Sequence, residues 1–248
     1  MLSFFCLFVL SGPLPALSIV CLGDSLTAGR GVDEEQAFPA VVRRLAMADG
    51  LDWTVVNAGV SGDTSAGGLR RVAWLVKSKP DWALVALGGN DGLRGQPTTA
   101  MSDNLIKIIQ QFRAAQVRVA LAGMRLPTNY GEDYRTAFAA VFPALATKES
   151  VPLLPFLLTD VGGVAKLNQA DGIHPTVAGQ AIIARTVYTF LKPLVEADKK
   201  AEHQKTEAPS VEPKSEQKSE QKSEQKSEQK TEQKSEQKSE PKTVESHR

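Results

Sequence analysis

The chain has 248 residues, a formal net charge of +1 and two cysteines. The first 198 residues carry 17 Lys and Arg against 17 Asp and Glu, so no charge excess points to nucleic acid or an anionic membrane surface as a partner. Cys6 and Cys21 do not indicate a disulfide framework, and no spacing of Cys and His is typical of a metal site.

The N-terminus begins with an uncharged apolar run, MLSFFCLFVL, followed by SGPLPALS. This pattern resembles the core of a secretory signal with Ala16-x-Ser18 as its cleavage site, although the usual preceding basic residues are missing. The run is too short to span a bilayer. We therefore expect a signal peptide over residues 1–18, no stable membrane span and a periplasmic or secreted protein. The alternative is an N-terminal core strand.

Apolar runs that suit buried strands then alternate with amphipathic stretches. The candidate strands are Ser18–Leu22, Thr54–Asn57, Trp82–Leu87, Val117–Ala122 and Val151–Pro155. The candidate helices are Gln36–Ala48, Ala66–Lys77, Thr99–Ala115, Tyr134–Lys148 and Thr176–Val195. This alternation predicts one α/β domain over residues 19–197, with a parallel sheet covered by helices on both faces. In such a sheet ligands bind beyond the carboxyl ends of the strands, so the chemistry is expected in the residues that follow each strand.

Residues 198–248 form a polar tail, in which a KSEQ unit repeats from Lys214 to Glu240. The tail has too little apolar surface to offset the entropy of ordering, so we expect it to be disordered. A helix is disfavoured for the repeat, because a period of four places like charges at positions i and i+4. The tail is interpreted as a solvated spacer or a wall-facing arm.

Only one histidine, His174, lies in the predicted domain, because His203 and His247 belong to the tail. His174 follows a strand, with Asp171 three residues before it and Pro175 directly after it. The proline biases His174 toward an extended backbone, and a short loop would let the Asp171 carboxylate accept the Nδ1–H of the imidazole. Nε2 would then be free to act as a base. Taken alone, the same D-x-x-H pattern is more often a helix cap or a surface turn.

Ser25 lies just after the first predicted strand, in the segment VCLGDSLTAG. On its own it could be the cap of a helix, but together with the candidate base His174 it is predicted to be the nucleophile of a Ser-His-Asp triad. Asp24, beside it, is a second carboxylate that we expect to bond the loop backbone. Cys21 is expected to be a buried strand residue.

An acyl-transfer site also needs hydrogen-bond donors for the developing oxyanion. The candidates are the backbone N–H groups of Ser25 and Gly62 and the side-chain amide of Asn90, which follow three different strands. They can converge on one crevice because parallel strands end at the same edge of a sheet. For Gly62 the alternative is a turn that requires a positive φ, and for Asn90 it is an Asx-turn.

The segments GDSLTAG, NAGVSGDTS, GGNDGLRG and DGIHP, in this order, resemble the four blocks of the SGNH (GDSL) hydrolases. The resemblance covers about residues 17–195. The segments LGGNDGLRG, RLPTNYG and VPLLPF are most similar to its bacterial branch of multifunctional acyl-CoA thioesterases, lysophospholipases and arylesterases. It implies a flavodoxin-like three-layer α/β/α sandwich around a five-stranded parallel sheet ordered 2-1-3-4-5, without a metal or organic cofactor. It further implies that Ser25 is the nucleophile, Gly62 and Asn90 are oxyanion donors, His174 is the base and Asp171 orients it.

We therefore expect a hydrolase of acyl esters or thioesters, with lysophospholipid among its substrates, that acts as a monomer on small molecules and binds no nucleic acid. The loops Leu93–Pro97, Leu126–Tyr130 and Leu157–Leu167 are expected to form a groove for the acyl chain. One alternative is a carbohydrate esterase that deacetylates polysaccharide with the same triad. Another is a non-catalytic binding module, which is disfavoured because no member of the proposed triad or oxyanion set is missing.

Overall fold

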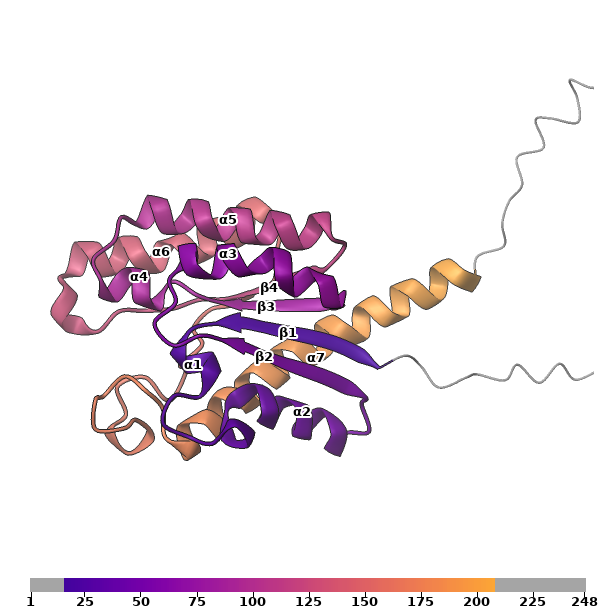
Figure 1. Cartoon of the computed structure of the whole chain (residues 1–248), viewed down its shortest axis with the longest axis horizontal. Coiled ribbons are helices and arrows are strands. Elements are labelled where there is room, and N and C mark those ends of the chain that lie inside the picture. The colour runs from indigo at the N-terminus through magenta and orange to yellow at the C-terminus, as the bar shows by residue number, and fades with distance from the viewer. Residues whose placement is uncertain (1–15, 208–248) are drawn as a thin grey trace, which may run out of the picture. The chain divides into compact units, whose positions relative to one another are not determined.

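The computed structural model describes residues 16–207 and is built around one parallel sheet (Figure 1). Its strands are β1 (Leu17–Gly23), β2 (Trp53–Gly59), β3 (Trp82–Ala86), β4 (Arg118–Ala122) and β5 (Leu153–Leu154). They pair in parallel in the order β2-β1-β3-β4-β5. The predicted five-stranded sheet and its strand order are therefore confirmed.

Helices cover both faces of this sheet. They are α1 (Ser25–Ala28), α2 (Phe38–Ala48), α3 (Ser65–Leu75), α4 (Gly89–Leu93), α5 (Thr98–Ala114), α6 (Glu132–Glu149) and α7 (Val177–Glu207). Figure 1 shows α3, α5 and α6 on one face of the sheet, and α2 with the part of α7 up to residue 196 on the other. The predicted three-layer α/β/α sandwich is thus confirmed. The short helices α1 and α4, which follow β1 and β3, were not among the candidate helices.

The burial of the strands follows from their place in the sheet. β3 is buried along its whole length because it lies between β1 and β4 and both of its faces are covered. The edge strand β2 keeps Thr54 and Val56 exposed. Cys21 in β1 has no exposed surface, as predicted, and burial raises the pKa of its thiol to about 12.

The strands β2, β1 and β3 are paired in a register that places their carboxyl ends next to one another. Gly23 at the end of β1 lies opposite Gly59 of β2 and Ala86 of β3. The strand order reverses direction between β1 and β3, where ligands bind in sheets of this type. The segments that follow β1, β2 and β3 therefore start side by side at this point.

The N-terminal end of the fold lies two residues earlier than the predicted boundary at residue 19. Leu17 is buried in β1 and its N–H donates to the carbonyl oxygen of Asp52 at 2.9 Å. The N–H of Ser18 donates to Asp81 Oδ2 at 2.7 Å. Cleavage after Ser18 would remove both of these hydrogen bonds at the amino end of β1. The rest of the predicted signal peptide lies outside the described residues.

At the other end, α7 continues through Glu207, ten residues into the segment predicted as a disordered tail from residue 198. The reason is local, since residues 197–207, ADKKAEHQKTE, contain no Gly or Pro and are mostly strong helix formers. The remaining tail, 208–248, lies outside the described residues, so its disorder stays a prediction. No helix within residues 16–207 is long and apolar enough to cross a membrane.

Candidate active site

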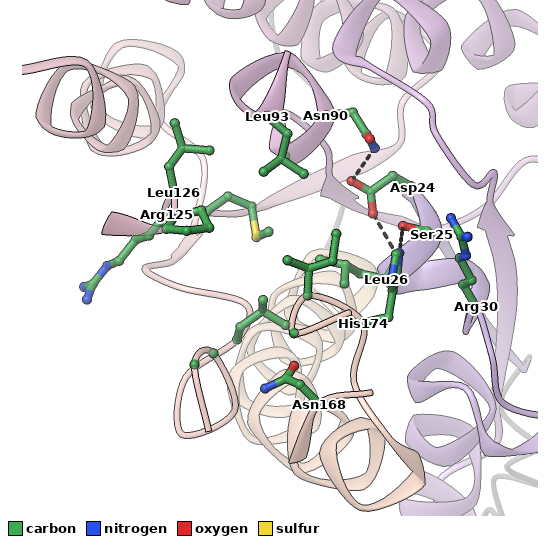
Figure 2. Close-up of a pocket in the computed structure, with 18 of the residues that line it drawn as sticks. Asp24, Ser25, Leu26, Arg30, Asn90, Leu93, Arg125, Leu126, Asn168 and His174 are labelled. Carbon is green, nitrogen blue, oxygen red and sulfur yellow. Dashed lines mark hydrogen bonds between the residues drawn. The ribbon is translucent and has the colours of Figure 1, made fainter. Parts of the chain in front are cut away.

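Ser25 is the first residue of α1, directly after the carboxyl end of β1 (Figure 2). The cap of this helix is Asp24, whose Oδ1 accepts a hydrogen bond from the N–H of Leu26 at 3.0 Å. The cap role that the sequence left open for Ser25 therefore belongs to its neighbour. The Ser25 side chain is free to project into the pocket at the end of the sheet, where it is 8% exposed.

His174 contacts both other members of the predicted triad. Its Nε2 lies 2.9 Å from Ser25 Oγ, and its Nδ1 lies 2.7 Å from Asp171 Oδ2. The first contact joins residues separated by 149 positions in the chain, across the carboxyl end of the sheet. The structure therefore brings Ser25, His174 and Asp171 into one chain of hydrogen bonds, with the imidazole in the middle.

Asp171 also forms the turn that places His174. Its Oδ1 accepts the backbone N–H groups of Ile173 at 3.1 Å and His174 at 3.0 Å. From the sequence alone, a turn and an imidazole partner are alternative roles for Asp171 in the D-x-x-H pattern. The carboxylate has both roles. The hydrogen bond from the His174 side chain, followed by the backbone bonds, lowers the pKa of Asp171 to about 2. Asp171 is therefore a carboxylate throughout the neutral range.

The two predicted oxyanion donors outside α1 line the same pocket as Ser25. Gly62 has a φ of +84°, so the turn expected as its alternative is also real. Among residues 16–207 no group accepts the Gly62 N–H. Asn90, in α4, donates through Nδ2 to the carbonyl oxygen of Asp63 at 2.9 Å and to Asp24 Oδ2 at 3.3 Å. Both amide hydrogens of Asn90 are therefore engaged in this structure.

Asp24 is a second carboxylate at the site, and its environment is opposite to that of Asp171. It is 3% exposed, and burial raises its pKa to about 6 in spite of the Leu26 hydrogen bond and the attraction of His174. Its partners are the backbone of Leu26 and the amide of Asn90. This agrees with the structural role expected from its position.

The pocket beside Ser25 has a volume of about 470 Å³. Its apolar wall comprises Leu93, Met124, Leu126, Phe156, Leu158 and Ile173. Each of the three loops predicted to form an acyl groove contributes to the lining. Figure 2 shows Leu93 and Leu126 on one side of Ser25 and Arg30 on the other. The pocket thus has an apolar arm on one side of the serine and the cationic Arg30 on the other.

Sequence reasoning missed the groups that tie the site segments together. Asp91, next to Asn90, accepts the N–H of Ser65 at 2.7 Å through Oδ2 and the Ser65 hydroxyl at 2.6 Å through Oδ1. Asn104 of α5 donates to the same hydroxyl at 3.0 Å. These residues, apart from Asn104, stand inside the quoted segments GGNDGLRG and NAGVSGDTS. The only available signal was therefore their closeness to Asn90 and Gly62.

No group of three or more His, Cys, Asp or Glu side chains in the part of the chain that the structure describes could hold a metal ion. The groups that the site offers are instead a hydroxyl, an imidazole with its carboxylate, and N–H donors facing an apolar pocket. Such a set suits nucleophilic attack on a carbonyl followed by stabilisation of an oxyanion.

Comparison with known proteins gives consistent matches. Residues 21–182 match the model of the GDSL-like Lipase/Acylhydrolase family. The chain is 43% identical to Esterase TesA of Pseudomonas aeruginosa over 190 residues, which cover 76% of this chain and 94% of that protein. It is 42% identical to Thioesterase 1/protease 1/lysophospholipase L1 of Escherichia coli K12 over 186 residues, 73% of this chain and 86% of the relative. The crystal structure of TesA superimposes with a TM-score of 0.69 at 44% identity, covering 71% of this chain and 99% of that one.

Proposed function

Because the chain is a hydrolase that belongs to the GDSL-like Lipase/Acylhydrolase family, we propose that it cleaves acyl esters or thioesters through Ser25, His174 and Asp171. The observation that carries this proposal is the position of His174, with Nε2 2.9 Å from Ser25 Oγ and Nδ1 2.7 Å from Asp171 Oδ2. An imidazole held between a hydroxyl and a carboxylate is the arrangement that activates a serine nucleophile.

In the first half of the cycle, His174 Nε2 takes the proton of Ser25 as Oγ bonds to the substrate carbonyl carbon. The Asp171 carboxylate accepts the Nδ1–H, which keeps the lone pair on Nε2 and stabilises the imidazolium that forms. The imidazolium then gives its proton to the departing alcohol or thiol, leaving an acyl group on Ser25. A water molecule repeats the attack, and His174 again takes and returns the proton.

The negative charge on the carbonyl oxygen develops beside the N–H groups of Ser25 and Gly62 and the amide of Asn90. The Gly62 N–H has no acceptor among the described residues, so it is available without the loss of another bond. Asn90 must give up one of its two hydrogen bonds to donate to the oxyanion. Its bond to Asp24, at 3.3 Å, is the longer of the two. Hydrogen bonds at a site without substrate are commonly longer than those in the reacting complex.

The substrate is proposed to be a small amphiphilic ester or thioester whose acyl chain occupies the apolar arm of the pocket. The apolar wall from Leu93 to Ile173 supports this placement, as do the names of the two relatives, an esterase and a thioesterase/lysophospholipase. The pocket lining also includes Arg30, on the other side of Ser25 from Leu93 and Leu126, so a polar or charged leaving group would find a cationic side chain there.

A series of p-nitrophenyl acyl esters, from acetate to palmitate, tests the activity directly, with acyl-CoA thioesters as a second series. The wild-type chain is compared with Ser25→Ala and with the matched control Ser102→Ala at a half-buried position of α5. We expect Ser25→Ala to lower turnover by a factor on the order of 10⁴ or more while the control is unchanged. Circular dichroism of the three proteins checks that their folds agree.

The chain-length profile separates the remaining alternatives. A maximum at medium or long acyl chains supports hydrolysis of acyl lipids or thioesters. Hydrolysis of acetyl esters alone would instead favour the carbohydrate esterase that deacetylates polysaccharide. If neither series shows turnover that depends on Ser25, the proposal is wrong and a non-catalytic binding module takes its place.

Export, a monomeric state, the absence of nucleic acid as a partner and a solvated repeat tail complete the proposal. They are supported by the apolar N-terminal run, by the balanced charge of the first 198 residues and by the KSEQ repeat.

A further inference from the structure

Arg71 of α3 makes a set of contacts that the proposed reaction does not yet use. Its side chain runs back across the carboxyl ends of β1 and β2, where its guanidinium donates to the carbonyl oxygen of Ala58 at 2.9 Å and of Gly23 at 3.2 Å. It also donates through Nε to Asp63 Oδ2 at 2.8 Å, and a second nitrogen lies 2.7 Å from the same oxygen. One side chain of α3 thus contacts both the end of β1 and the segment 58–63 at and after the end of β2.

Two of these partners, Gly23 and Asp63, lie close in the chain to members of the proposed catalytic site. Gly23 comes directly before Asp24 and Ser25, while Asp63 comes directly after Gly62. The carbonyl oxygen of Asp63 also accepts the 2.9 Å hydrogen bond from Asn90 Nδ2. The guanidinium is therefore one residue away from the Gly62 donor and one hydrogen bond away from the Asn90 donor, through Asp63.

The Asp63 carboxylate fits closely between Arg71 and the first turn of α3. A Cβ atom at Gly67 would lie 2.3 Å from Asp63 Oδ1, so only glycine leaves room for this side chain. The carboxylate and the guanidinium are 16% and 26% exposed. The pair is therefore partly shielded from solvent, where a charged pair with several hydrogen bonds is more strongly held than at the surface.

We propose that Arg71 is a positioning residue for the oxyanion donors, which it holds through Asp63 at the distance from Ser25 that the reaction needs. This inference rests on the proposed function, because it concerns the same oxyanion. Arg71 makes no contact with the substrate in this account. It fixes the segment 58–63 against the end of β1, and Asp63 in turn fixes the amide of Asn90.

The expected effect is on turnover rather than on substrate binding. A displacement of about 1 Å in a reacting geometry can cost about 10²-fold in rate. We therefore expect Arg71→Met to lower kcat by roughly 10- to 100-fold with little change in KM, since the oxyanion exists only in the transition state. Arg71→Lys keeps a charge for Asp63 but lacks the fork that reaches both carbonyl oxygens, so it should recover part of the lost turnover.

The adjacent residue provides a matched control. Arg70 lies on the same helix, is exposed, and no hydrogen bond or ion pair of its side chain is found within residues 16–207. Arg70→Met and Arg71→Met remove the same side chain from the same turn of α3. Equal kcat values for the two variants would overturn the proposal, provided that Ser25→Ala abolishes turnover. Full turnover in Ser25→Ala would instead overturn the proposed function itself.

A double-mutant cycle with Asn90→Ala distinguishes positioning from a general loss of stability. If Arg71 acts through the Asn90 donor, the double variant should lose far less than the product of the two single losses. A product of independent effects would show that Arg71 does not act through the Asn90 donor, and the proposal that it holds both donors through Asp63 would be wrong. Urea unfolding of each variant reports whether its fold is retained. Should Arg71→Met fail to fold, Arg71→Lys and Asp63→Asn enter the same cycle with the same two outcomes.

Discussion

The two sides of Ser25 are built in different ways. On the side of the base, Asp171 and His174 lie three residues apart in one turn, and a single carboxylate both shapes that turn and binds the imidazole. On the side of the oxyanion, the donors come from the segments after β1, β2 and β3, and contacts of Arg71 and Asp91 with residues 13 to 48 positions away hold those segments together. One side is local in sequence and the other is assembled by the fold.

The two sides of the site also differ in their carboxylates, Asp171 beside His174 and Asp24 beside Ser25. Asp171 is partly exposed and its pKa is lowered to about 2, chiefly by its bond from His174. Asp24 is buried and its pKa is raised to about 6, chiefly by desolvation. Substitutions on the base side should therefore affect the chemistry with little effect on folding. Substitutions on the oxyanion side should affect turnover and stability together.

The largest effect should come from Asp171→Asn. The asparagine oxygen can still accept the N–H groups of Ile173 and His174, so the turn is expected to persist. Its amide nitrogen, however, faces His174 Nδ1 as a donor and selects the tautomer that cannot accept the serine proton. We expect kcat to fall by a factor on the order of 10⁴, with only a small decrease in the midpoint of thermal unfolding near neutral pH because the Asp171 side chain is partly exposed.

The control for this variant is Asp160→Asn, at an exposed carboxylate in the connection between β5 and α7 that also carries Asp171. Because the folded pKa of Asp171 is below the ordinary value of 3.8, its stabilising contribution is present above pH 3.8 and is lost as pH falls toward 2. Asp171 is therefore ionised at every pH in the neutral range, so the loss of kcat in Asp171→Asn should be the same throughout this range. A defect that disappears as pH rises would contradict this assignment.

A smaller loss is expected for Asn90→Ala, which removes one of three proposed oxyanion donors. Turnover should fall by a factor on the order of 10²–10³, corresponding to about 3–4 kcal/mol of transition-state stabilisation. The bond to the carbonyl oxygen of Asp63 is lost as well, so a modest decrease in stability should accompany the kinetic loss. Steady-state kinetics and urea unfolding measure the two effects. Near-complete turnover in this variant would remove Asn90 from the oxyanion site.

The smallest kinetic effect, with the clearest effect on stability, is expected for Asp24→Asn. Asparagine caps a helix about as well as aspartate, but it carries no charge to desolvate. The folded pKa of about 6 lies above the ordinary 3.8, so ionised Asp24 favours the unfolded chain. The wild-type protein should therefore lose up to about 3 kcal/mol, relative to the variant, as pH rises from 3.8 to 6.

The measurement is the difference in unfolding free energy between Asp24→Asn and the wild type, taken on both sides of this pH interval. Asp103→Asn, at an exposed position of α5, serves as the control and should show no such dependence. The variant also loses the contact of Asp24 with Asn90, which lowers its unfolding free energy at every pH. This loss does not change how the difference from the wild type depends on pH. A difference that stays constant across the interval would show that Asp24 is not buried as a destabilised carboxylate.

Much of the fold followed from pattern alone. Apolar runs alternating with amphipathic stretches predicted the parallel strands, because strands buried on both faces must be apolar throughout. The ends of most elements differed by a few residues, and β1 begins at Leu17, inside the predicted signal peptide. The largest difference is at α7, where helix-forming residues continue past the domain without a stop signal. The short helices α1 and α4 were missed because four or five residues are too few to show a helical period.

For the site, the sequence by itself determined the part that depends on nearby residues. A single domain histidine, an aspartate three residues before it and a serine after the first strand identified the candidate triad. Only the tertiary structure decided how the oxyanion side is held, by Arg71 on Gly23 and Ala58 and by Asp91 on Ser65. Chain connectivity confines residues within one turn to a few arrangements. Contacts between distant segments instead depend on strand order and register, which arise from packing of the whole sheet.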